Sequence, residues 1–156
     1  MSSVQSILSD PRFIEAGIAE MVYYGVGETI VEKGSEERGL YLIESGRVRV
    51  LERIELEGQR HIQPGICDLT VGEVFGELGL YEPGPRMASV VTVEPCEILE
   101  FDAIALAAYL DDRPELGYQV LKELFNILTD RLRQTDRRMG SLFAWGLKAH
   151  GIDRHL

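Results

Sequence analysis

The sequence predicts a mainly β fold, a β-sandwich or jelly-roll β-barrel, followed by a long C-terminal helix. Between residues 20 and 101, short segments rich in β-branched and aromatic residues alternate with glycine-containing turns. After Asp112 the apolar residues instead recur at steps of three and four, which is the period of a helix. A chain of 156 residues that is 45% hydrophobic can bury one core. We therefore expect a single domain over residues 1–156, with the barrel at about 20–101, helices at 102–142 and a tail at 143–156.

The elements are expected in the following order. Two short helices, Val4–Leu8 and Phe13–Ile18, flank Pro11 at the start of the chain. The strands that follow, each bounded by turn residues, are Met21–Tyr24, Thr29–Val31, Gly39–Glu44, Arg47–Leu51, Arg60–Ile62, Ala88–Val93 and Glu97–Phe101. The stretch from Arg53 to Leu69 is less regular, and its pattern does not define a strand register.

Two helices are expected after the last strand. Ala103–Leu110 forms a compact helix, and Asp112–Glu115 has the acid, the early proline and the later glutamate of a helix start. The long helix then carries a heptad seam: Leu121, Phe125, Leu128, Leu132, Thr135, Met139 and Leu142. A second apolar set could pack on the chain's own barrel: Leu116, Val120, Leu124 and Ile127. Both contacts are compatible, and the seam favours a homodimer over a monomer.

The run from Phe75 to Ser89 predicts a site for a small anion. Gly76 allows backbone to come close to a ligand, and the N–H groups of the turn that Glu77 opens can point at a phosphate. Arg86 supplies a charged fork of donors. Beside a bound phosphate, the Glu77 carboxylate needs a hydrogen-bond donor from the same ligand, and a ribose hydroxyl is such a donor. The alternative is a glycine-containing turn with an unrelated arginine.

This run resembles the phosphate-binding cassette of the cyclic nucleotide-binding domain family, which reads F-G-E-L-A-L and then P-R-x-A-[ST]. The resemblance implies that Glu77 binds the ribose 2′-hydroxyl and that Arg86 binds the cyclic phosphate. Gly79 stands where the family often has alanine. Met87 stands where the family usually has Ala, Ser or Thr against the nucleotide, which bears on affinity and base preference. The implied ligand-binding residues in this stretch are Phe75, Gly76, Glu77, Leu78, Arg86, Met87 and Ala88.

Thr135 is the one polar residue of the heptad seam. A threonine inside a helix can bond its own backbone, or it can serve a ligand. The stretch Arg131–Leu142 resembles the long dimer helix of catabolite-activator-type regulators in the same family, in which a threonine at the matching place meets the adenine. This resemblance adds Thr135 to the implied ligand-binding residues. It runs from about Gly27 to Leu142, and the residues from there to Leu156 are too few for the helix-turn-helix domain of such regulators.

Composition disfavours several other classes of function. The net charge of -10 at pH 7 disfavours direct nucleic-acid binding. Cys67 and Cys96 are too few and too far apart for a disulfide framework, a paired metal motif or an iron–sulfur sensor. His61 is the only histidine of the expected barrel, so we expect no metal, no cofactor and no enzymatic activity. The N-terminus lacks a signal pattern and no apolar run could span a bilayer, so we expect a cytoplasmic protein without a membrane partner.

The sequence therefore favours a regulatory domain that binds cyclic AMP, or cyclic GMP, and signals to an unidentified downstream protein through its C-terminal helix. Two alternatives stay open. The chain could be a dimerising scaffold that has lost nucleotide binding, for which Met87 is the warning sign. It could also be the sensor half of a transcription regulator whose DNA-binding domain is absent from this chain.

Overall fold

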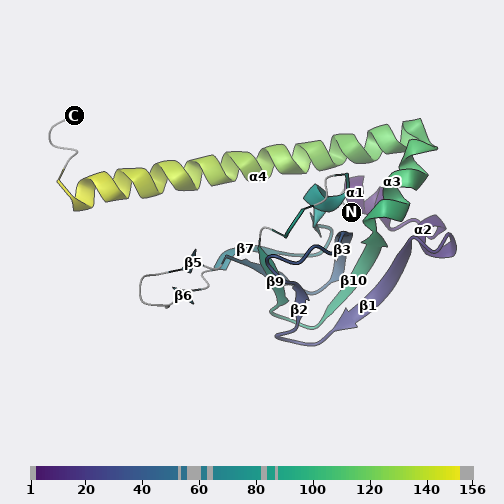
Figure 1. The fold of residues 1–156 in the computed structure, drawn as a ribbon, viewed down its shortest axis with the longest axis horizontal. Coiled ribbons are helices and arrows are strands. Elements are labelled where there is room, and N and C mark those ends of the chain that lie inside the picture. Colours follow the sequence, from purple (N-terminus) through teal and green to yellow (C-terminus); the bar gives the residue numbers. More distant parts are fainter. Residues whose placement is uncertain are drawn as a thin grey trace. The chain divides into compact units, whose positions relative to one another are not determined.

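The computed structural model describes residues 3–52, 54–55, 61–62, 65–81, 84–86 and 88–151. The chain forms two compact units, Met1–Gly117 and Tyr118–Leu156, and each is described by itself. The first unit contains the strands and three short helices, and the second contains most of the long helix α4 (Pro114–Ala149) (Figure 1).

Two antiparallel four-stranded sheets form the body of the first unit. The first sheet has the order β1 (Ala19–Tyr24), β10 (Cys96–Asp102), β3 (Gly39–Ser45) and β8 (Val74–Phe75). The second has the order β2 (Thr29–Val31), β9 (Ser89–Thr92), β4 (Val48–Leu51) and β7 (Gly65–Leu69). A separate two-stranded ribbon pairs β5 (Ile54–Glu55) with β6 (His61–Ile62).

The mainly β architecture is confirmed, but the two sheets do not close into a barrel. Closure requires hydrogen-bonded strand pairs all the way round. Within the described residues, β1 and β8 are the edges of one sheet and β2 and β7 are the edges of the other. The edge strands are short: β8 has two residues and β2 has three. They therefore offer few backbone groups for hydrogen bonds between the two sheets. The sheets are joined by a shared apolar core instead, whose members from both sheets include Tyr41, Ile43, Val48, Phe75, Val90 and Ile98.

The central strand β3 is buried on both faces. Residues Leu40 to Ile43 are all apolar and all buried, as expected for a strand that is covered on both sides. Tyr41 and Ile43 belong to the core shared with the other sheet. Leu40 lies on the opposite face beside its ladder partner Phe101. Phe101 meets Phe13 edge to face, with ring centroids 5.6 Å apart.

Three helices lie around the first sheet: α1 (Ser3–Leu8), α2 (Arg12–Glu15) and α3 (Ala103–Asp111). The Asp102 carboxylate caps α3 by accepting a hydrogen bond from the Ala105 N–H at 3.0 Å. The helix expected at Phe13–Ile18 is shorter than predicted, because Gly17 adopts a φ of 74° and ends it. The other expected helices and strands are confirmed to within a few residues. The irregular stretch after Arg53 contains β5, β6 and β7, which the pattern did not define, and Arg60 lies outside the described residues.

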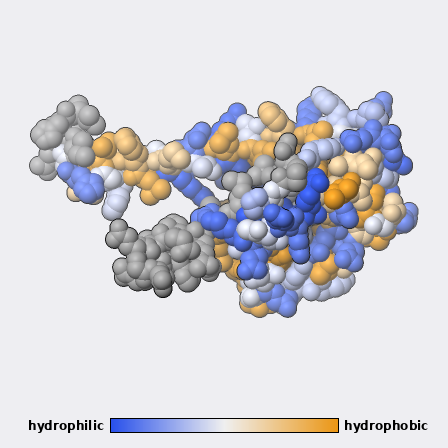
Figure 2. All heavy atoms as spheres, viewed as in Figure 1, coloured by the Kyte–Doolittle hydropathy of each residue, from blue (hydrophilic) through white to orange (hydrophobic). Residues whose placement is uncertain are grey.

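The helix α4 is 36 residues long and continues through the expected tail to Ala149. Val120 and Leu124 are buried, whereas much of the predicted seam is exposed to solvent. The exposed apolar residues of α4 are Tyr118, Leu121, Phe125, Leu132, Met139, Leu142, Phe143 and Trp145. Figure 2 shows orange, hydrophobic residues interspersed with blue, hydrophilic ones along this helix. No helix among the described residues is long and apolar enough to cross a membrane.

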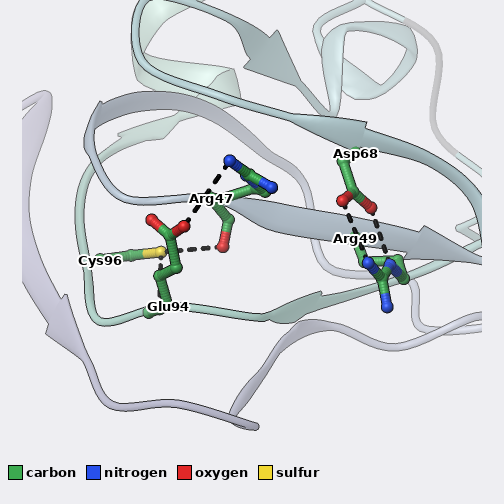
Figure 3. Close-up of polar contacts among 5 residues, drawn as sticks. All are labelled: Arg47, Arg49, Asp68, Glu94 and Cys96. Atoms are coloured by element: carbon green, nitrogen blue, oxygen red, sulfur yellow. Dashed lines mark hydrogen bonds and ion pairs between the residues drawn. The ribbon is translucent and has the colours of Figure 1, made fainter.

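One exposed ion pair joins two strands of the second sheet, and another joins the turn before β4 to the turn after β9 (Figure 3). Arg49 on β4 donates two hydrogen bonds, of 2.7 and 3.1 Å, to the carboxylate of Asp68 on β7. Arg47 approaches Glu94 at 3.7 Å. Because these pairs are solvent-exposed, each contributes little to stability. Cys96 beside them is buried and free, and burial raises the pKa of its thiol, so it stays protonated at neutral pH.

Thr92 ties the turn between β1 and β2 to β9. Its hydroxyl donates to the Gly25 carbonyl at 2.5 Å and accepts from the Glu28 N–H at 2.9 Å. Its backbone N–H donates to the Glu28 carbonyl, and its carbonyl accepts from the Gly27 N–H, each at 2.9 Å. Thr92 itself is only 2% exposed, and its side-chain hydrogen bonds to this turn are partly buried.

We predict that Thr92→Val lowers the free energy of unfolding by about 1 to 3 kcal/mol, because it removes two partly buried hydrogen bonds, to the Gly25 carbonyl and from the Glu28 N–H. The isosteric change creates no cavity. Thr129→Val is the control, since the Thr129 hydroxyl donates an exposed hydrogen bond to the Phe125 carbonyl within its own helix. Urea denaturation of the three proteins measures the effect, and equal losses for both variants would contradict the prediction.

Candidate functional site

The cassette begins where β8 ends in a left-handed glycine. Gly76 has a φ of 80° and stands at the start of η2 (Glu77–Gly79), a single 3-10 turn. A Cβ at position 76 would lie 2.4 Å from the Gly39 carbonyl oxygen and 3.1 Å from Arg86 Nη1. Both the backbone conformation and the packing therefore require glycine here. The result is that β3, η2 and Arg86 meet with no side chain between them.

Arg86 lies with its guanidinium against this backbone. Its Nη2 donates to the Gly39 carbonyl at 2.8 Å, and its Nη1 donates to the Gly76 carbonyl at 3.3 Å. Its Nε is buried and has no hydrogen-bond partner among the described residues. No carboxylate in the described part of the chain forms an ion pair with Arg86. A half-buried positive charge with an unmet donor is thus held at the end of β8.

The aromatic ring of Tyr41 lies beside the Arg86 guanidinium. Its ring stacks on Phe75 at a centroid distance of 4.8 Å, and the Arg86 guanidinium carbon lies 5.8 Å from its centroid. Burial raises the pKa of the Tyr41 hydroxyl, and the Arg86 charge opposes that change. Tyr41 is therefore neutral at pH 7 and leaves the charge of Arg86 available.

Gly79 also lies against Arg86. A Cβ at position 79 would approach Arg86 Nη1 to 3.1 Å, which is tighter than an ordinary van der Waals contact. An alanine there would require the guanidinium to shift by a few tenths of an ångström. Glycine in place of the alanine that is frequent at this position therefore lets Arg86 lie close over the turn.

The loop between β2 and β3 holds the cassette from the other side. The Arg86 N–H donates to the Ser35 carbonyl at 2.7 Å, and the Arg86 carbonyl accepts from the Gly34 N–H at 2.9 Å. The Arg38 side chain donates to the Gly79 carbonyl at 3.0 Å and to the Leu80 carbonyl at 2.9 Å. These bonds fix the backbone of Arg86 and the end of η2 relative to β3.

The structure brings together four of the residues that the sequence singled out: Phe75, Gly76, Glu77 and Arg86. Glu77 is half-buried at the first position of η2. Leu78 lies in the same turn, and Ala88 is half-buried just before β9. Met87 lies outside the described residues.

Thr135 lies in the second unit, on α4, whereas the cassette belongs to the first unit. Its hydroxyl donates to the Arg131 carbonyl at 2.9 Å, as a threonine inside a helix commonly does. The hydroxyl oxygen keeps lone pairs that can accept a hydrogen bond.

Sequence reasoning missed Arg38, Gly39 and Tyr41. Gly39 and Tyr41 were assigned only to a strand, and Arg38 was not singled out. The one available signal was the unbroken apolar run of β3, which marks a strand buried on both faces and so a strand central to any site. No group of three or more His, Cys, Asp or Glu side chains that could hold a metal occurs in the described part of the chain.

A family model described as "Cyclic nucleotide-binding domain" matches residues 21–113. The chain belongs to the cyclic nucleotide-binding domain family. Within this family it is 31% identical, over 116 residues, to the CRP-like cAMP-activated global transcriptional regulator of Mycobacterium tuberculosis, covering 74% of this chain and 48% of that protein. It is 35% identical, over 119 residues, to the cyclic AMP receptor protein of Thermus thermophilus, covering 76% of this chain and 51% of that protein. The chain thus spans about half the length of these relatives.

Solved structures of this family have the same fold. The catabolite activator protein of Thermus thermophilus superposes with a TM-score of 0.67 at 28% identity, covering 90% of this chain and 63% of that one. A cyclic nucleotide-binding domain from Methylobacillus flagellatus superposes with a TM-score of 0.72 at 22% identity, covering 87% of this chain and 80% of that one. The resemblance identified from the cassette is therefore confirmed at the level of family and fold.

Proposed function

We propose that this chain is a regulatory domain that senses cyclic AMP and does not act as an enzyme. The observation that carries the proposal is Arg86: its buried Nε–H lacks an acceptor among the described residues, while its other nitrogens are fixed by backbone carbonyls. A cyclic phosphate offers anionic acceptors of the kind that this donor lacks. The family membership supports the same ligand class.

In the proposed complex, Arg86 binds the phosphate and is oriented before the ligand arrives. The Gly39 and Gly76 carbonyls hold the fork, and the Tyr41 ring limits its movement. Less side-chain entropy is then lost on binding than with a mobile arginine. The phosphate charge would also offset the cost of keeping the guanidinium half-buried.

Glu77 is assigned to the ribose. Carboxylate oxygens only accept hydrogen bonds when ionised, so beside a phosphate Glu77 favours a ligand that also presents a hydroxyl donor. A ribose 2′-hydroxyl meets this requirement, and a sulfate ion, which carries no proton at neutral pH, does not. The pair Glu77 and Arg86 therefore discriminates a ribonucleotide from a simple anion.

We assign recognition of the adenine base and transmission of the signal to α4. Thr135 can accept a hydrogen bond from the adenine amino group, and Met87 offers no hydroxyl to a guanine. Thr135 shares its seam with Leu132 and Met139, which are 62% and 65% exposed. An exposed apolar seam at heptad spacing supports a homodimer. We propose that nucleotide occupancy and the geometry of this helix bias each other, and that a downstream protein in the cytoplasm reads the change.

We predict that Arg86→Ala or Glu77→Ala weakens binding of cyclic AMP by about thirtyfold or more, which corresponds to about 2 to 4 kcal/mol for a lost charge-assisted contact. Arg86→Lys keeps the charge but loses the planar fork, and it should also bind weakly. Arg49→Ala removes an exposed arginine and serves as the control. Calorimetric titration of folded variants, checked by thermal melting, gives the affinities, and parental affinity in Arg86→Ala would overturn the assignment.

Cyclic AMP should bind more tightly than cyclic GMP, because Thr135 offers an acceptor to the adenine amino group. Competition with a fluorescent cyclic AMP analogue measures the preference, and Thr135→Val should reduce it. The assignment of Thr135 fails if cyclic GMP displaces the analogue at an equal or lower concentration than cyclic AMP.

Leu132→Lys should convert a dimer into a monomer, because it places a charge in the seam of each helix. Gln134→Lys introduces the same charge outside the seam and should leave the dimer intact. Sedimentation equilibrium reports the mass of each variant. A parent protein with the mass of one chain, or a Leu132→Lys variant with twice that mass, would show that α4 does not join two copies through this seam.

A further inference from the structure

Arg38 contacts the cassette through its side chain and is not among the residues assigned to the nucleotide. Its Nε donates to the Gly79 carbonyl at 3.0 Å and its Nη2 to the Leu80 carbonyl at 2.9 Å. Both bonds are partly buried and join residues about forty positions apart in sequence. The Arg38 carbonyl also accepts from the Ala103 N–H, at 3.4 Å, where α3 begins. Arg38 thus connects the turn that carries Glu77 to the beginnings of β3 and α3.

A turn as short as η2 needs such support. The last carbonyls of any helical segment lack partners within the helix, and a single turn fixes several dihedral angles for few hydrogen bonds. Within the turn, the Gly79 N–H donates to the Gly76 carbonyl at 3.0 Å and the Leu80 N–H donates to the Glu77 carbonyl at 3.2 Å. Arg38 adds two charge-assisted hydrogen bonds at the C-terminal end of the turn, where the carbonyls have no partners within the helix.

The same loop holds the other half of the site. Gly34 and Ser35 bond the backbone of Arg86, and Gly39 accepts from its guanidinium. The segment from Gly34 to Gly39 therefore fixes Arg86 through backbone groups and the Glu77 turn through one side chain. Only Arg38 among these contacts can be removed by a side-chain substitution without changing a glycine or Arg86 itself.

We propose that Arg38 is a positioning residue for the nucleotide site: it holds η2 so that Glu77 meets the ribose hydroxyl while Arg86 holds the phosphate. This inference rests on the proposed cyclic nucleotide function and adds a residue outside the cassette to it. Because Arg38 acts through Glu77, its loss weakens recognition of the ribose 2′-hydroxyl more than recognition of the phosphate.

The test compares Arg38→Gln with the parent, and with Arg49→Gln as a matched control that removes an exposed arginine paired with Asp68. Hydrogen exchange of the Gly79 and Leu80 amides, measured by NMR without ligand, reports the stability of η2. Titrations with cyclic AMP and with 2′-deoxy cyclic AMP report ribose recognition. Arg38→Gln should speed exchange at both amides and weaken cyclic AMP binding about tenfold or more, while 2′-deoxy cyclic AMP loses much less affinity. The control should match the parent throughout.

Unchanged exchange at Gly79 and Leu80 in a folded Arg38→Gln variant would overturn the inference. Equal losses of affinity for the two nucleotides would also overturn it, since they would mean a general structural role. Both results leave the proposed function intact if the parent binds cyclic AMP. A parent that binds neither nucleotide would overturn the proposed function, and the nucleotide role of Arg38 with it.

Discussion

The candidate site depends on one interaction. The Arg86 guanidinium donates hydrogen bonds to the backbone carbonyls of two glycines. Gly39 and Gly76 each present a carbonyl to the fork, and a Cβ at Gly76 would fill the space in which they meet. The contact uses part of the donor capacity of the guanidinium and leaves Nε–H buried without an acceptor in the described part of the chain. Arg86 is therefore fixed in orientation but incompletely satisfied, and this combination suits an anion-binding residue.

The two-sheet body makes this contact possible. The strand β3 is buried on both faces, so the Gly39 carbonyl at its start is held rigidly, and pairing of Tyr41 with Phe75 on β8 places Gly76 close to it. The loop before β3 then bonds the backbone of Arg86 and, through Arg38, the end of η2. The cassette and the segment that holds it, which are more than forty positions apart in the chain, thus meet at the central strand.

Much of the fold and of the candidate site could be predicted from the sequence. The features that could not be predicted depend on contacts between distant parts of the chain or on a single backbone conformation. Three features of the sequence are local patterns: the two-residue alternation of the strands, the heptad seam and the run from Phe75 to Ser89. They predicted the fold class, the long helix and the family, respectively. A closed barrel was expected because alternation shows that strands exist but not which edges pair. Arg38 was missed because a guanidinium that bonds two carbonyls some forty positions away leaves no local pattern. The shorter helix at Arg12–Glu15 shows a missed stop signal, since Gly17 ends it in the left-handed conformation.

The central claim is that a nucleotide phosphate completes the hydrogen bonding of Arg86. The most direct measurement is the ¹⁵N-edited NMR resonance of the Arg86 Nε–H, assigned by its absence in Arg86→Lys, during titration with cyclic AMP and, separately, with adenosine. Cyclic AMP should move this resonance downfield and slow its exchange with water, because the proton gains an anionic acceptor. Adenosine, which has no phosphate, should leave it in place. A resonance unaffected by saturating cyclic AMP, or moved equally by adenosine, would contradict the account.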